Sequence, residues 1–192
     1  MAQRIGILGG TFDPVHVGHL VLAACARDQL ATDRFLLIPN FRSPLKSTTP
    51  VAAFADRCEM LRLAVGMTPG LSVGDLEGQR GGVSYTIDTL RALKRELPDS
   101  DLFLVLGADA LADFAAWKEN DHVARLAHLV GVQRGPDRPV ASAMLTQLVQ
   151  MPRLDVSSSL IRARVAVGET IDFLTPPAVA DYIRTRDLYR HG

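Results

Sequence analysis

The chain has 192 residues, 47% of them hydrophobic and 22% charged, and its 21 lysines and arginines balance its 21 aspartates and glutamates. This composition predicts a globular domain with a sizeable core, and the zero net charge argues against a broad basic surface for nucleic acid or an anionic membrane. No run of about 18 apolar residues is present, so we expect neither a membrane-spanning helix nor a signal peptide. With only two cysteines, the expected compartment is a reducing cytoplasm.

Apolar runs of strand length alternate with segments of helical periodicity along most of the chain. The runs predict strands over residues 4–8, 34–39, 71–73, 102–106, 128–132 and 153–156. The periodic segments predict helices over residues 15–29, 54–65, 85–96, 141–149, 158–167 and 176–187, and a short helical stretch around Trp117. Residues 40–50, rich in proline and basic residues, and the glycine-rich residues 78–82 are expected to be loops.

This alternation predicts an α/β fold, a doubly wound, Rossmann-like parallel sheet with helices on both faces. Sheets of this kind bind ligands beyond the carboxyl ends of their strands, at the point where the strand order reverses. Four stretches with unusual residues come just after predicted strands: residues 9–19, 40–46, 107–109 and 157–162. We expect these four stretches to converge on one cleft.

The first stretch reads Gly-Gly-Thr-Phe-Asp-Pro-Val-His-Val-Gly-His. Bare glycine N–H groups before a helix start are typical of a phosphate site, and His16 and His19 would share one face of the first helical turn. Imidazole N–H groups there could donate to phosphate oxygens and stabilise charge that shifts during transfer. Alternatives are a metal pair, which lacks a third ligand nearby, an acid–base pair with Asp13, which could equally cap the helix, and two surface histidines.

The last stretch reads Ser-Ser-Ser-Leu-Ile-Arg (residues 157–162) and predicts a second anion site at a helix start. Ser158 is a good N-cap residue, Ser159 falls in the first turn, and Arg162 extends a planar fork of donors from the next turn. The alternative is a capped helix with a solvated arginine.

Together these two stretches resemble the signature of the nucleotidyltransferase superfamily with the HxGH motif, whose members move a nucleoside monophosphate from a triphosphate to an acceptor. Further segments follow in order: Ser-Tyr-Thr (84–86), Gly-Ala-Asp-Ala-Leu (107–111), Phe-Ala-Ala-Trp (114–117) and Leu-Tyr-Arg (188–190). With them, nearly the whole chain resembles the bacterial nicotinate-mononucleotide adenylyltransferase family. The resemblance implies a single nucleotidyltransferase domain over residues 1–192, whose C-terminal helical part, about 157–192, completes the ATP site.

The resemblance also implies an activity, the transfer of AMP from ATP to nicotinate mononucleotide. The products would be nicotinate adenine dinucleotide (deamido-NAD) and pyrophosphate, in NAD biosynthesis. Mg²⁺ would be bound through the ATP phosphates, because the sequence shows no carboxylate cluster to hold it. ATP and nicotinate mononucleotide are thus the implied partners, with neither nucleic acid nor membrane, and the sequence leaves a homo-oligomer open.

Two other functions are compatible with the same residues. One is a sister nucleotidyltransferase that uses another phosphorylated acceptor, such as nicotinamide mononucleotide or phosphopantetheine. The other is a catalytically weak nucleotide-binding module on the same fold.

Carried onto this chain, the resemblance implies three groups of site residues. The catalytic contacts to phosphate are His16, His19 and Arg162. The residues implied to bind ATP are Gly9, Gly10, Thr11, Phe12, Lys46, Gly107, Asp109, Ser158 and Ser159. The residues implied to bind the acceptor are Tyr85, Thr86 and Trp117, with the tryptophan stacked on the pyridine ring. Simpler interpretations are core packing for Trp117, a helix cap for Asp109 and a plain helix start at residues 84–86.

One segment departs from the family's pattern. The loop after the second predicted strand reads Ser-Pro-Leu-Lys (residues 43–46), where the family typically has Pro-Pro-His-Lys. Lys46 keeps a cation that could reach the triphosphate, but Leu45 cannot donate to a phosphate. This is the one feature that favours the weak nucleotide-binding module.

Overall fold

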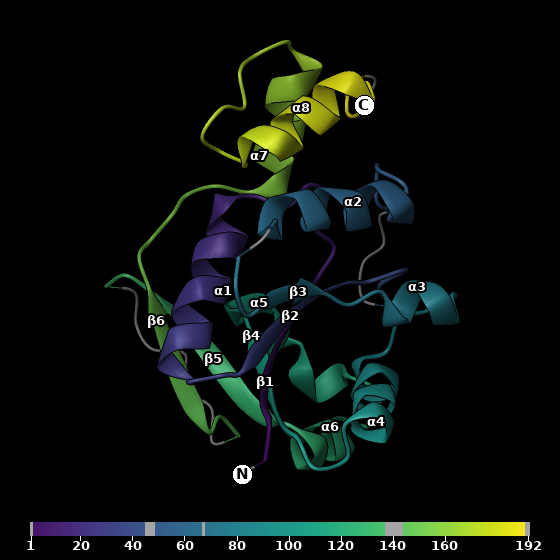
Figure 1. The fold of residues 1–192 in the computed structure, drawn as a ribbon, viewed down its shortest axis with the longest axis vertical. Coiled ribbons are helices and arrows are strands. Elements are labelled where there is room, and N and C mark those ends of the chain that lie inside the picture. The colour runs from purple at the N-terminus through teal and green to yellow at the C-terminus, as the bar shows by residue number, and fades with distance from the viewer. Residues whose placement is uncertain (1, 45–48, 67, 137–143, 191–192) are drawn as a thin grey trace.

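The computed structural model describes residues 2–44, 49–66, 68–136 and 144–190. Within them one sheet is formed by six strands: β1 (Arg4–Gly10), β2 (Arg34–Pro39), β3 (Leu71–Val73), β4 (Asp101–Leu106), β5 (His128–Arg134) and β6 (Gln147–Met151). The strand order is β3-β2-β1-β4-β5-β6, and every neighbouring pair is parallel. The order reverses between β1 and β4, which confirms the predicted doubly wound α/β fold (Figure 1).

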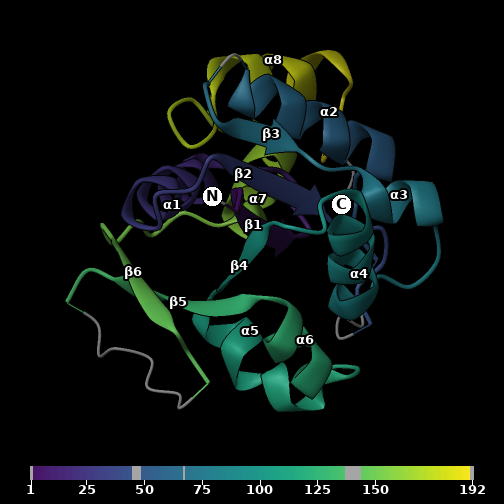
Figure 2. The same cartoon turned by 60° about the horizontal axis from the view of Figure 1, so that its bottom comes forward.

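Helices cover both faces of this sheet. They are α1 (Val17–Gln29), α2 (Phe54–Val65), α3 (Leu76–Arg80), α4 (Thr86–Glu96), α5 (Ala108–Ala112), α6 (Asn120–Leu126), α7 (Ser158–Ala166), α8 (Pro177–Thr185) and the 3₁₀ turn η1 (Phe114–Ala116). The core on one face is built with α1, α2, α7 and α8, and the core on the other face with α4, α5 and α6. Figure 2 shows α5 and α6 on the far side of the strands from α2 and α8.

The four central strands, β1, β2, β4 and β5, are buried on both faces, as parallel strands usually are. In β2, Phe35 and Leu37 belong to the core that contains α1, whereas Leu36 and Ile38 belong to the core that contains α4. This alternation follows from the two-residue period of a strand. It also explains Gly6 in β1, where an added Cβ would lie 2.2 Å from the Phe35 ring.

Two elements near the C-terminal part of the sheet differ from the prediction. The sixth strand is β6, whose first three residues, 147–149, fall in the helix predicted over 141–149, whereas the expected strand over 153–156 is irregular. As an edge strand, β6 buries only Val149 and Met151 and leaves its other side chains exposed, so its pattern is too sparse to distinguish strand from helix. Residues 141–143 of the predicted helix lie outside the described residues.

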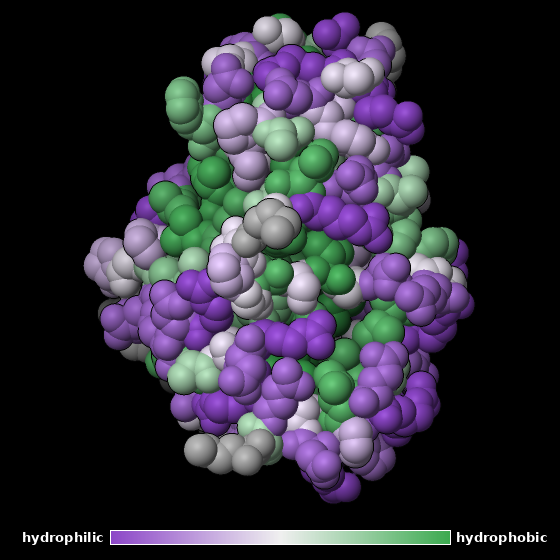
Figure 3. Space-filling model, viewed as in Figure 1, coloured by the Kyte–Doolittle hydropathy of each residue, from purple (hydrophilic) through white to green (hydrophobic). Residues whose placement is uncertain are grey.

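The other predicted elements are largely confirmed, with one exception in the expected turn over residues 78–82. Residues 76–80 form the short helix α3, which buries Glu77. At the carboxyl edge of the sheet, α7 and α8 lie over α1 and α2 at the top of Figure 1. Figure 3 shows the side of the molecule that faces the viewer in Figure 1, with apolar side chains gathered at its centre and polar residues around the rim. Among the helices of the described residues, none has the length and apolar character needed to span a membrane.

Candidate functional site

A cavity of about 670 Å³ lies at the carboxyl edge of the sheet, where the strand order reverses. Its walls come from the ends of β1, β2, β4 and β5 and from the start of α4. This size is typical of a small-molecule site. The predicted site residues that line it are Gly9, Gly10, Thr11, Tyr85, Thr86, Gly107, Asp109 and Trp117.

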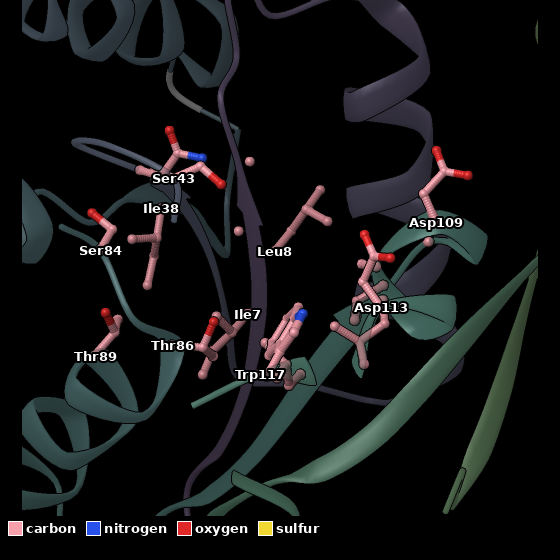
Figure 4. Close-up of a pocket in the computed structure, with 18 of the residues that line it drawn as sticks. Ile7, Leu8, Ile38, Ser43, Ser84, Thr86, Thr89, Asp109, Asp113 and Trp117 are labelled. Atoms are coloured by element: carbon pink, nitrogen blue, oxygen red, sulfur yellow. The ribbon is translucent and has the colours of Figure 1, made fainter. Parts of the chain in front are cut away.

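The side chains in this cavity are divided between two walls. Figure 4 shows Thr86 and Thr89 on one side and Asp109 and Asp113 on the other, with Trp117 between them. Asp109 is exposed and lies in the first turn of α5, whose N-cap is Gly107, so the interpretation of Asp109 as a helix cap is wrong.

Three glycines line the candidate site among the predicted residues, and the reason why glycine fits differs between them. An added Cβ at Gly9 or at Gly107 would meet no atom within 4 Å, so packing within the described chain does not require glycine at either position. Both residues line the cavity, and their lack of a side chain leaves room for a ligand. At Gly10, by contrast, a Cβ would lie 3.0 Å from the Phe12 ring, so this glycine accommodates Phe12.

Phe12 lies in the core rather than in the cavity wall. Its side chain is buried, its backbone is left-handed with φ of 50°, and its ring meets the edge of the His19 ring at a centroid distance of 4.9 Å. The structure therefore places Phe12 as a support for His19, and any contact of Phe12 with a nucleotide has to come from its backbone.

The two histidines lie together at the start of α1. His16 is the N-cap residue, and the ring centroids of His16 and His19 are 3.7 Å apart. The backbone N–H of His16 donates to Nδ1 of His19 at 3.3 Å, so a neutral His19 ring carries its proton on Nε2. Neither histidine lines the cavity, but Gly9, Gly10 and Thr11, which precede the histidines at the end of β1, do.

His16 is buried, and its burial, together with the positive charge of Arg134, lowers the pKa of His16 from 6.5 to about 4. The ring is therefore neutral at pH 7. Its Nδ1 atom is buried and has no hydrogen-bond partner within the described part of the chain. An added Cβ at Gly18 would lie 3.0 Å from this atom, so Gly18 makes room for the ring of His16.

Two residues of α7, Ser158 and Arg162, contact the histidine loop, which we define as residues 13–19. Ser157 is the N-cap of α7, because its Oγ accepts the N–H of Leu160 at 3.1 Å, and the prediction of Ser158 as N-cap is wrong. Ser158 Oγ donates instead to the carbonyl of Pro14 at 2.8 Å. None of the α7 residues lines the cavity.

Arg162 also reaches the histidine loop. It donates from Nη1 to the carbonyl of Asp13 at 2.7 Å and from Nη2 to Ser159 Oγ at 3.2 Å. The solvated-arginine alternative is therefore wrong. Lys46 and Leu45 lie outside the described residues.

Asp13 takes neither role that the sequence suggested for it, a helix cap or an acid–base partner of the histidines. The N-cap position of α1 belongs to His16. The buried carboxylate of Asp13 accepts hydrogen bonds from the backbone N–H groups of Val51 and Ala52, at 2.7 and 3.0 Å, and from the hydroxyl of Tyr189 at 2.8 Å.

Arg57 is a structural cation of the site that sequence reasoning missed. It is buried in α2 and donates from Nη1 to the carbonyls of Thr11 and Asn40, at 2.7 and 2.8 Å, so it joins the loops after β1 and β2. Burial lowers the pKa of Arg57, and the nearby charge of Asp13 opposes that shift. The sequence did indicate that Arg57 is buried, because it lies four residues before the buried Leu61, on the apolar face of the predicted helix.

Arg134 was missed as well, although it lines the cavity at the end of β5. It is exposed, and its positive charge acts on His16. The rule that singled out Asp109, a charged residue just after a buried strand, applies equally to Arg134.

At the other end of the cavity, Trp117 faces residues at the start of α4. Tyr85 is the N-cap of α4 and Thr86 its first residue. Trp117 is partly buried and packs against Phe114 at a centroid distance of 5.4 Å, yet it also lines the cavity. Core packing therefore describes only part of its surroundings.

Two surface ion pairs hold the Trp117 segment against α4. Arg91 meets the two carboxylate oxygens of Glu119 at 3.1 and 2.6 Å. Lys118 Nζ lies 3.5 Å from Asp88 and 4.5 Å from the centre of the Tyr85 ring.

For a metal ion, the described residues offer no cluster of three or more His, Cys, Asp or Glu side chains.

Comparison with known proteins points to one family. A family model described as cytidylyltransferase-like matches residues 7–164. The protein named nicotinate-nucleotide adenylyltransferase in Rhodopirellula baltica is 42% identical over 199 residues, which cover 97% of this chain and 93% of that protein. The protein of the same name in Thermus thermophilus is 42% identical over 189 residues, which cover 98% and 100%. In fold, the chain is similar to Plasmodium falciparum nicotinic acid mononucleotide adenylyltransferase complexed with NaAD, with a TM-score of 0.77, 22% identity and coverage of 99% and 98%.

Proposed function

This chain belongs to the cytidylyltransferase-like family and, within it, to the nicotinate-nucleotide adenylyltransferases, and from that premise we propose that its cavity transfers AMP from ATP to nicotinate mononucleotide. The products are nicotinate adenine dinucleotide and pyrophosphate. The observation that carries this proposal is the cavity at the reversal of strand order, with the bare Gly9 and Gly107 at the strand ends and Trp117 opposite Thr86.

The reaction needs no covalent intermediate on the protein. An oxygen of the acceptor phosphate forms a bond to the α-phosphorus of ATP, the bond from that phosphorus to the bridging oxygen breaks, and pyrophosphate leaves with the electron pair. The protein aligns two anions and stabilises charge on the leaving group.

The histidine loop supports the phosphate end of this reaction. His19 presents an Nε2–H donor because its Nδ1 accepts the N–H of His16, and the neutral ring of His16 also carries one N–H, so each ring donates a hydrogen bond to phosphate. The N-terminus of α1 adds its positive dipole end. Arg134 and Lys46 supply positive charge. Ser158, Ser159 and Arg162 act at the pyrophosphate side of the histidine loop, which Ser158 and Arg162 contact.

The Trp117 end supports binding of the acceptor. The ring of Trp117 stacks on the pyridine ring, and the N-terminus of α4 at Tyr85 and Thr86 receives the nicotinate carboxylate through backbone N–H groups and the helix dipole. A carboxylate gains more than a neutral amide from such a helix end, so this arrangement favours nicotinate over nicotinamide mononucleotide.

Mg²⁺ and the cellular compartment complete the proposal. The ATP phosphates supply ligands for Mg²⁺, which neutralises charge on the leaving pyrophosphate when it is bound. The free cysteines Cys25 and Cys58 are consistent with a cytoplasmic enzyme.

A single assay tests the activity and the choice of acceptor. The chain is incubated with ATP, Mg²⁺ and either nicotinate or nicotinamide mononucleotide, and pyrophosphate and dinucleotide are measured. We expect both products with nicotinate mononucleotide and a lower kcat/KM with the amide. A preference for the amide or for phosphopantetheine would indicate a sister enzyme, and nucleotide binding without pyrophosphate release would indicate a binding module.

A further inference from the structure

The C-terminal segment is bonded to the histidine loop at almost every position from residue 13 to residue 17. Besides the contacts of Arg162 and Ser158 with the carbonyls of residues 13 and 14, Thr175 Oγ1 donates to the carbonyl of Val15 at 2.9 Å. The backbone N–H of Val17 donates to the carbonyl of Leu174 at 3.0 Å. The loop that carries the histidines therefore takes its shape from residues more than 140 positions away in the chain.

Asp13 is the point at which three segments meet. Its carboxylate receives the hydroxyl of Tyr189 from the C-terminal segment and the N–H groups of Val51 and Ala52, which directly follow the loop over residues 40–50. A buried carboxylate is stable only when donors replace its water, and here both oxygens are used.

Tyr189 holds an uncommon conformation to make this contact. Its backbone is left-handed, with φ of 66°, which costs a residue with a side chain some strain. Its side chain is nevertheless buried, and burial and the charge of Asp13 both raise the pKa of Tyr189, so the hydroxyl remains a donor. Neither the cavity nor the phosphate contacts described above involve Tyr189.

We propose that Tyr189 is a positioning residue of the reaction: its hydrogen bond to Asp13 fixes the histidine loop so that His16 and His19 face the transferring phosphate. This inference rests on the proposed function, because it needs the histidines to act on phosphate. A loop that loses this bond still folds, but its imidazoles sample orientations that no longer match the transition state, which lowers kcat more than it raises KM.

The chain provides a matched control in Tyr182. Its hydroxyl donates to Asp56 Oδ1 at 2.8 Å, the same pair of groups at the same distance as in the Tyr189–Asp13 contact. That bond ties α8 to α2, and the hydroxyl of Tyr182 donates to α2 rather than to the histidine loop. Tyr189→Phe and Tyr182→Phe therefore each remove one tyrosine–aspartate hydrogen bond, buried in the first case and partly buried in the second, and only the first removes one from the loop.

The test compares kcat, both KM values and Tm of the wild type and these two variants. In Tyr189→Phe we expect kcat to fall about 10-fold, the scale of a modest misalignment of catalytic groups, with both KM values within about twofold. Tyr182→Phe is expected to keep kcat within about twofold and to lower Tm by no more than Tyr189→Phe does, because its hydrogen bond is only partly buried. Unchanged kcat in Tyr189→Phe, or an equal loss in both variants, would overturn the positioning role.

A second measurement does not depend on turnover. In Tyr189→Phe, NMR titration should show the pKa of His16 rising from about 4 toward 6.5, because a loosened loop admits water to the ring, whereas Tyr182→Phe should leave it unchanged. A His16 titration that is the same in all three proteins would count against the inference. An inactive wild type with this NMR shift would instead contradict only the proposed function.

Should Tyr189→Phe fold poorly, Thr175→Val removes the buried donor to the Val15 carbonyl with little change in volume. The same loss of kcat at nearly constant KM is expected there. A Thr175→Val enzyme with wild-type kcat would overturn the proposal, because it would show that the histidine loop keeps its catalytic geometry after losing a hydrogen bond to the C-terminal segment.

Discussion

The two ends of the cavity are held in place by different interactions, buried hydrogen bonds at one end and exposed ion pairs at the other. At the phosphate end, Arg57 and Asp13 are 1% and 4% exposed and bind backbone groups of the loops around them. At the acceptor end, the segment that carries Trp117 is tied to α4 by Arg91 and Glu119, whose side chains are 42% and 32% exposed.

This difference sets how much each end can move. Buried hydrogen bonds act at low local dielectric and leave unsatisfied groups when they break, so they hold one geometry. Exposed ion pairs compete with water and salt and exchange easily. Under the proposed function, the phosphate end keeps a fixed arrangement of donors, and the acceptor end can adjust around an incoming ring.

The largest effect is expected from Arg57→Met, which breaks the buried network at the phosphate end. It removes the hydrogen bonds that Arg57 donates to the carbonyls of Thr11 and Asn40 and the cation near Asp13, so we expect a loss of about 3 kcal/mol in the free energy of unfolding. Urea denaturation measures it. The control, Arg62→Met on the exposed side of α2, should cost less than about 1 kcal/mol, and equal losses would refute the comparison.

His19→Ala removes a donor of the phosphate end without touching the buried network. We expect kcat to fall about 10²-fold or more, the scale of losing one donor to a developing oxyanion, with Tm nearly unchanged. Pyrophosphate release measures the rate. His128→Ala, at the amino end of β5 and stacked on Phe103, should keep its kcat. Near-normal turnover in His19→Ala would show that the histidine does not contact phosphate.

Trp117→Ala tests the acceptor end. Loss of ring stacking should raise KM for nicotinate mononucleotide about 10-fold and leave KM for ATP unchanged, whereas Trp117→Phe should retain most of the affinity. Because the chain contains a single tryptophan, its fluorescence in the wild type reports acceptor binding directly. No fluorescence change on addition of the acceptor would argue against stacking.

The smallest effect is expected from Arg91→Ala, which breaks the exposed pair with Glu119. KM for the acceptor should rise only about two- to threefold at low salt, and the difference from wild type should shrink as salt is added, because the pair is already screened. Arg95→Ala, on the exposed side of the same helix, is the control and should show neither effect. A large effect that persists at high salt would mean that the acceptor end is as rigid as the phosphate end.

Sequence patterns alone determined most of the fold and the location of the site. Strand β2 and helix α2 begin and end at the predicted residues, because apolar spacing and the proline and glycine stops are local properties. The parallel alternation then required the loops after β1 and β4 to meet at one edge, and both line the cavity. The edge strand β6 was missed because most of its side chains are exposed, and its two buried residues are too few to give a recognisable alternation of apolar and polar residues.

Only the tertiary structure decided which polar groups pair. The bond between Asp13 and Tyr189 joins residues 176 positions apart, and Arg57 finds carbonyls on two different loops. Ser158 and Arg162 were predicted from sequence as anion ligands. The fold adds a second role, because both residues donate hydrogen bonds to backbone carbonyls of the histidine loop. A polar side chain binds whatever donor or acceptor the packed chain leaves unsatisfied beside it, and that neighbour exists only after the sheet and its helices have assembled.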